Sequence, residues 1–154
     1  MQTSRVPAAL NALLEILRAR PALEGVAIVD GPTAVNLTNR RRIHIGWSPG
    51  AEQAVALEQS FSGAGARTRD EEFVISCYAE SRGGDKDMAL RRGDAFTLIG
   101  EVEQALRATN EAPEAPTLNG TVLWAHLTTG DLAQSASEGA TVGVAFTVSC
   151  RARI

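Results

Sequence analysis

The residue types that most often carry catalysis are sparse in this chain. Its 154 residues include two histidines, two cysteines and a single lysine. His44 and His126 each lie in an expected strand, and neither has a second histidine or a cysteine at zinc-ligand spacing. We therefore interpret both as structural or surface histidines. No local signature joins Cys77 or Cys150 to a histidine, so cysteine–histidine catalysis has no support either. The pattern predicts no metal and no cofactor.

An acidic run and a glycine-rich run suggest two further enzyme classes, and the sequence supports neither. A magnesium-dependent nuclease needs carboxylates that converge from neighbouring strands, commonly beside a lysine. The run 70–72 (Asp-Glu-Glu) sits at the start of one strand, and Lys86 lies elsewhere, at an expected helix start. The run 63–67 (Gly-Ala-Gly-Ala-Arg) lacks the Gly-Lys-Ser/Thr of a phosphate-binding loop and leads into a strand. We interpret it as a hairpin tip and expect no enzyme.

Charge restricts the function further. The chain has 15 basic and 18 acidic residues, a formal net charge of -3. Proteins that bind duplex nucleic acid usually carry a basic excess, because neutralised phosphates supply most of the affinity. The one dense basic cluster is Arg40, Arg41 and Arg42, just before an expected strand. A solvated loop, a contact with a partner protein and a contact with phosphates all remain open for this cluster.

Composition is typical of one cytosolic domain. Hydrophobic residues make up 44% of the chain and charged residues 21%, both close to globular averages. No apolar run reaches the roughly 18 residues of a membrane span, and charged residues interrupt the first 20 positions, unlike a signal peptide. Cys77 and Cys150 lie far apart in apolar segments, so we expect buried thiols. A disulfide between them stays open, because the sequence does not give their distance in space. We expect a single domain over 1–154.

Two amphipathic helices are expected among the elements that position the candidate residues. Leucines at i, i+3, i+4 and i+7 from Leu10 predict the first, with Ser4 as its N-cap and Pro21 as its limit. The second is expected from Asp85, as N-cap, to about Ala108. The apolar stripe that it should bury consists of Met88, Ala95, Leu98, Ile99, Val102, Ala105 and Leu106.

Alternating apolar and polar residues predict the strands. The alternation is clearest over 71–81 and 141–154, and it is typical of a sheet with one buried and one wet face. Shorter strands are expected at 25–30, 42–47, 55–61 and 121–127. The predicted fold is α+β, with two helices on one face of a mainly antiparallel or mixed sheet of about five strands.

Several segments together resemble a known family. They are 6–10 (Val-Pro-Ala-Ala-Leu), 23–26 (Leu-Glu-Gly-Val), 29–32 (Val-Asp-Gly-Pro), 45–47 (Ile-Gly-Trp), 65–73 and the closing run 138–154. In these segments, and in their order around the long helix, the chain resembles the tail-terminator (tail-completion) proteins of long-tailed bacteriophages, especially those of actinobacterial hosts. The resemblance spans nearly the whole chain, and none of its segments carries catalytic residues.

This resemblance implies a structural virion protein. Such proteins form a hexameric ring on the last ring of tail-tube subunits, end tube polymerisation and present the surface that docks the head or its connector. Genomic DNA would pass through the ring without specific binding, which suits a net acidic chain. The implied location is the tail–neck junction of the virion, after assembly in the cytoplasm of the bacterial host.

Two segments provide the candidate partner contacts. Residues 61–72 are expected to form a hairpin or loop that reaches a neighbour, and 40–42 form the second candidate. The contact residues are Phe61, Arg67, Arg69, Glu71, Glu72, Arg40, Arg41 and Arg42. Two alternatives stay open, another head–tail joining or minor tail protein and a small dimeric ligand-binding α+β module. The ligand-binding module predicts a pocket with convergent polar groups.

Overall fold

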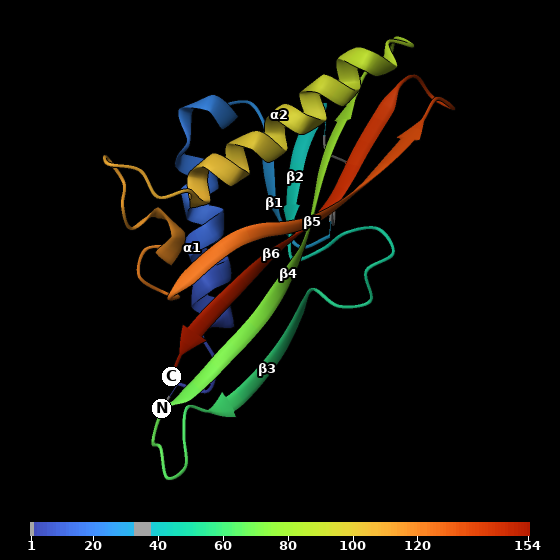
Figure 1. The fold of residues 1–154 in the computed structure, drawn as a ribbon. Helices are drawn as coiled ribbons and strands as arrows, with labels where there is room; N and C mark the ends of the chain where they lie inside the picture. Colours follow the sequence, from blue (N-terminus) through green and yellow to red (C-terminus); the bar gives the residue numbers. More distant parts are fainter. Residues whose placement is uncertain (1, 33–37) are drawn as a thin grey trace.

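The computed structural model describes residues 2–32 and 38–154 (Figure 1). Its helices are α1 (Val6–Ala19) and α2 (Met88–Leu106), and short 3-10 turns η1 (Pro21–Leu23) and η2 (Ala115–Thr117) follow them. Its strands are β1 (Ala27–Asp30), β2 (Arg41–Ile45), β3 (Val55–Phe61), β4 (Arg69–Arg82), β5 (Trp124–Ser135) and β6 (Thr141–Arg153). The expected α+β class is confirmed.

The six strands form one sheet around a long central strand. Their order is β1-β2-β4-β6-β5, and β3 pairs with β4 outside this path. The β1–β2 pair is parallel, whereas the others are antiparallel. β2 pairs with 77–81 of β4 and β3 with 69–75, so both lie along the same side of that strand. The sheet is thus mixed.

Both helices pack on one face of this sheet, as predicted (Figure 1). The apolar positions of β4 and β6 point toward them, because alternate side chains of a strand lie on opposite faces. Prominent core side chains are Phe73, Ile75, Cys77, Phe146 and Val148 from the strands, and Leu13, Leu17, Leu98 and Val102 from the helices. The alternation predicted for the two long strands is confirmed.

The start of α1 differs from the prediction by one residue. The N-cap is Arg5, which has no side-chain capping bond, rather than Ser4. The Ser4 Oγ instead accepts a hydrogen bond from the Val6 backbone N–H at 3.0 Å. The helix ends before Pro21, as expected.

The start of α2 also differs. Its N-cap is Asp87, whose carboxylate accepts a hydrogen bond from the Leu90 backbone N–H at 3.1 Å. Asp85, the predicted cap, forms an ion pair with Arg91 at 3.2 Å instead. The predicted stripe is confirmed, with Met88 and Ile99 partly buried and its other members buried. Among the described residues, no helix is long and apolar enough to span a membrane.

The prediction for β5 was wrong in extent. The strand begins at Trp124 and runs to Ser135, well past the expected end at Leu127. An irregularity between Leu127 and Thr129 shifts the register, and pairing with β6 then continues to its first residue. The turn-like residues 128–131 are therefore held in a strand by their partner. β5 and β6 form a long hairpin that projects beside the start of α2 (Figure 1).

Candidate functional site

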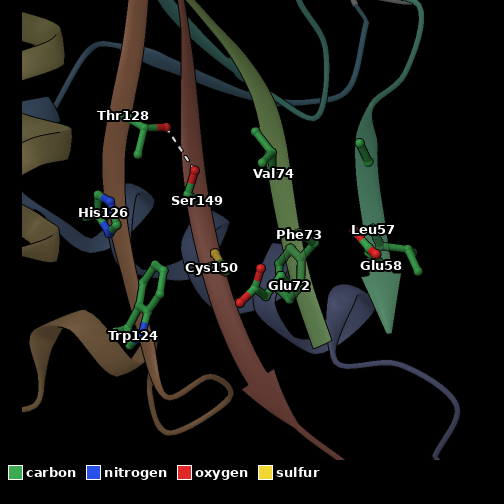
Figure 2. Close-up of a pocket in the computed structure, with 11 residues that line it drawn as sticks. Leu57, Glu58, Glu72, Phe73, Val74, Trp124, His126, Thr128, Ser149 and Cys150 are labelled. Atoms are coloured by element: carbon green, nitrogen blue, oxygen red, sulfur yellow. Dashed lines mark hydrogen bonds between the residues drawn. The ribbon is translucent and has the colours of Figure 1, made fainter. Parts of the chain in front are cut away.

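A groove of about 550 Å³ lies on the face of the sheet opposite the helices (Figure 2). It runs across β3, β4, β6 and β5. The side chains that face it come from alternate positions of these strands, and register places them on the same face. They are Ala56, Glu58, Glu72, Val74, Trp124, His126, Thr128 and Ser149. We call this set the open-face groove.

Two of the larger apolar side chains of the groove are open to solvent. Trp124 on β5 and Val74 on β4 each leave more than a third of their surface exposed. The Trp124 ring lies beside His126, with ring centroids 4.8 Å apart and planes tilted by 34°. The indole therefore has one side supported by its own strand and another side free for a contact.

Hydroxyl groups make up the upper part of the groove. Thr128 Oγ1 lies 2.9 Å from both Thr147 Oγ1 and Ser149 Oγ, and Thr129 Oγ1 lies 2.6 Å from Thr147 Oγ1. The irregularity in β5 brings two consecutive threonines to the same β6 residue. These hydroxyls bond to one another across the strands, which stabilises the β5–β6 pair.

Acidic groups dominate the β3–β4 side of the groove. Glu58 lies directly opposite Glu72 in the β3–β4 register, and like charges in that position are destabilising. The nearest cation to Glu72 is Arg151, at 3.8 Å. That arginine also pairs with Asp70 at 3.3 Å. Among the described residues, Glu58 takes part in no ion pair or side-chain hydrogen bond.

Asp70, beside the groove, is the well-neutralised carboxylate of this region. Arg153 Nε lies 2.8 Å from it and Arg151 Nη2 lies 3.3 Å from it. The hydrogen bond from Arg153 is the largest cause that holds the pKa of Asp70 below its usual range. Arg151 and Arg153 of β6 therefore both lie at Asp70, and within the described residues Glu58 has no cation as a partner.

The β3–β4 hairpin matches the expected hairpin or loop at 61–72. Phe61, at the end of β3, is 69% exposed, and its ring borders a shallow hollow over 63–66. Arg67 lies exposed in the turn, and Arg69 is half-buried where β4 begins. The hairpin is shown, and its contact with a neighbour stays a prediction.

Glu71 was expected at a partner contact, yet it is fully buried. Its carboxylate accepts hydrogen bonds from the Arg5 backbone N–H at 2.8 Å and from Gln59 Nε2 at 2.6 Å. β4 alternation turns it toward the helices, where it lies at the positive end of α1. Glu71 therefore stabilises the fold, whereas Glu72 is exposed on the opposite face.

The three arginines of the cluster at 40–42 have different surroundings. Arg40 and Arg41 are exposed, whereas Arg42 is buried on the open face, with Nη2 3.6 Å from Glu80 Oε1. The Nε of Arg42 has no hydrogen-bond partner in the described part of the chain. Arg40 and Arg41 thus stay candidates for a partner contact, whereas Arg42 forms an ion pair within the chain.

The two histidines have different surroundings. His44 is buried on β2, where its Nδ1 lies 3.0 Å from the Gly31 carbonyl oxygen and its ring lies 4.8 Å from that of Trp47. His126 is exposed in the groove. Within 2–32 and 38–154, no three side chains of metal-binding type come together.

Both cysteines are free and buried, as expected. Burial raises the pKa of the Cys77 thiol and of the Cys150 thiol to about 12 each. A thiol with such a pKa is almost entirely protonated near neutral pH, and the thiolate is the reactive form. The geometry therefore gives neither cysteine the character of a nucleophile.

The open-face groove was not predicted from the sequence. Its strands were predicted, but Val74, Trp124 and Ser149 were not singled out, and His126 was interpreted only as a structural or surface histidine. One signal was present, because Val74 is an apolar residue on the predicted wet side of its strand. The pairing of β5 with β6, which brings Trp124 and His126 to that side, could not be obtained from spacing within a segment.

Comparison with known proteins assigns no family to this chain. No protein-family model matches it, and no curated protein matches it either. Its function is therefore inferred from its own sequence and surfaces.

Proposed function

We propose that this chain is a tail-terminator protein of a long-tailed bacteriophage. In this role it is a structural virion protein rather than an enzyme, and six copies form a ring on the end of the tail tube. The ring ends polymerisation of the tube and provides the surface on which the head or its connector docks. The resemblance of the segments described above and the α+β fold support this proposal.

The observation that carries the proposal is the exposure of large apolar side chains in several separate regions of the surface. On β3 these are Leu57, within the strand, and Phe61, at its end beside the hairpin turn. Elsewhere they are Leu90 near the start of α2, Phe96 in the middle of α2 and Leu132 near the end of β5. Each is about half exposed or more. Contiguous exposed apolar surface marks protein contacts, and a subunit of a ring within a stack needs contacts both with its neighbours in the ring and with the layers on either side.

The remaining surfaces suit contacts between subunits. Within the described residues, the outer edges of β3 and β5 carry backbone groups that pair with no other strand of the sheet, and unpaired edges are ready to bind another chain. The open-face groove adds a shaped surface between those edges. A net charge of -3 agrees with a channel that lets DNA pass without holding it.

The groove also favours one alternative, a small ligand-binding module. Its volume falls within the range of ligand sites, roughly 300–1,000 Å³, and an aromatic ring lies beside hydroxyl groups. That function predicts saturable binding of a small molecule by a compact dimer. A further alternative is a head–tail joining or minor tail protein, which would bind similar partners at a different level of the tail.

The proposal is tested by growing tail tubes from purified tube subunits of the same virus, with and without this chain. A terminator shortens the tubes and is found at one end of each. Tubes of unchanged length whose ends lack the chain would reject the proposal. Tubes that carry the chain at their ends but grow to full length would support the joining or minor-tail alternative.

A further inference from the structure

We infer that the hairpin tip of one copy docks in the open-face groove of the next copy, so that subunits join head to tail. The hairpin tip is defined as residues 61–67, the end of β3 and the turn before β4. This inference rests on the proposed ring and names the two surfaces that hold it together.

The groove lacks a cation that its geometry calls for. Glu58 and Glu72 lie directly opposite each other on one face, and within the described residues only Arg151, at 3.8 Å from Glu72, offsets this pair. Arg151 is shared with Asp70. An arginine placed over the Glu58 side would relieve the repulsion between the two carboxylates. The groove therefore favours an occupant that brings both a cation and apolar surface for Trp124 and Val74.

The hairpin tip carries the complementary groups. Arg67 is exposed and forms no ion pair with any described residue, and Phe61 is 69% exposed. The residues between them are Ser62 and the small residues 63–66, followed by no acidic side chain before Asp70. The tip is narrow as well as basic, so Phe61 can contact Trp124 while Arg67 reaches Glu58 of another copy.

A chain cannot place this tip in its own groove. The β3–β4 ladder is continuous to the Phe61–Arg69 pair, and Ser62 and Thr68 add backbone and side-chain hydrogen bonds beyond it. The ladder holds the tip beyond the end of the sheet (Figure 1), whereas the groove lies on the face of the sheet (Figure 2). The occupant must then be a second copy. Contact between two different surfaces is head to tail, and it closes into a ring when the rotation permits.

Two charge-reversal variants test the contact. Arg67→Glu changes the tip and Glu58→Arg changes the groove, and each places like charges at every junction. We expect each variant alone to self-associate at least ~10-fold more weakly than the parent chain, measured by sedimentation and native mass. Lys86→Glu and Glu24→Arg are the matched controls, since they make the same charge changes at exposed positions elsewhere. Thermal unfolding of the four variants checks that they fold.

Mixing the two variants gives the sharper result. In an equimolar mixture, the tip of the Arg67→Glu variant can dock in the groove of the Glu58→Arg variant. The unchanged tip of the Glu58→Arg variant can dock in the unchanged groove of the Arg67→Glu variant, so opposite charges meet at every junction. An alternating ring with the mass of the parent ring is therefore expected. Failure of the mixture to assemble, when the parent chain does assemble, overturns the inference. A mixture that stops at a closed pair of chains also overturns it, because the contact would then be reciprocal.

The same samples separate this inference from the proposed function. A parent chain that shortens tail tubes but stays monomeric up to its solubility limit keeps the terminator role and rejects tip-in-groove docking. A chain whose variants are rescued by mixing, but which leaves tube growth unchanged, keeps the docking and rejects the terminator role.

Discussion

The two faces of the sheet are made from alternate residues of the same strands, and they have opposite characters. Toward the helices, Phe73 and Cys150 are almost completely buried. One position along each strand, Val74 and Ser149 face the groove and stay accessible. Strand geometry fixes which residues share a face, whereas the helices decide which face becomes the core.

This difference indicates that one face of the sheet stabilises the fold, whereas the other face is available for contacts. Burial of apolar area stabilises the covered face. The open face is held by a hydroxyl ladder around Thr147 and by ion pairs around Asp70, and groups of this kind contribute little to stability at a wet surface. Substitutions should therefore separate into those that unfold the chain and those that change its contacts.

The largest difference in the free energy of unfolding is expected between substitutions at two neighbouring residues of β4. Phe73→Ala should lower the free energy of unfolding by about 3–5 kcal/mol, because it removes buried contacts and leaves a cavity. Val74→Ala, on the open face, should change it by about 0.5 kcal/mol or less. Urea unfolding of both variants measures the difference. Similar losses for the two would show that the open face is also core.

Thiol chemistry offers a second comparison, between positions 149 and 150. With a pKa of about 12, the Cys150 thiol should react slowly with an alkylating reagent at pH 8. A cysteine introduced by Ser149→Cys, one residue away on the open face, should react roughly 10³-fold faster if its pKa is ordinary. Mass spectrometry of labelled peptides measures both rates. Equal rates in the folded chain would contradict the assignment of the two faces.

An intermediate effect is expected at the start of β4. Glu71→Ala should cost about 1–3 kcal/mol, because the Arg5 N–H and the Gln59 amide lose a buried acceptor. Glu72→Ala, its exposed neighbour, is the control and should stay within about 0.5 kcal/mol. The midpoint of urea unfolding reports both. An equal loss in the two variants would mean that Glu71 does not hold α1.

The smallest effect is a pH dependence on the open face. The pKa of Asp70 is lower in the folded chain than its usual value, chiefly because Arg153 donates a hydrogen bond to it. Its contribution is therefore present at neutral pH and is lost as the pH falls through the folded pKa, below about pH 4. Asp70→Asn should flatten the dependence of unfolding free energy on pH in that window. An unchanged slope would show that the ion pairs do not matter.

The sequence predicted features whose cause is local. Alternation in β4 and β6, the stripe of α2 and the stop at Pro21 each depend on residues within one segment. The extent of β5 was missed because residues 128–131 resemble a turn, and only pairing with β6 holds them extended. Glu71 was expected at a partner contact because the group that it binds, the start of α1, lies 66 positions away in the sequence. The groove was missed for the same reason, since four strands build it.

The most direct test of the central claim is an image of the chain on the end of a tail tube, obtained by electron microscopy of tubes grown from purified subunits. The proposed function predicts a ring of six copies with an open centre on one end of each tube. At sufficient detail, the hairpin tip of each copy should lie over the open-face groove of its neighbour. Bare tube ends, together with a compact closed dimer free in solution, would contradict the claim and favour the ligand-binding alternative.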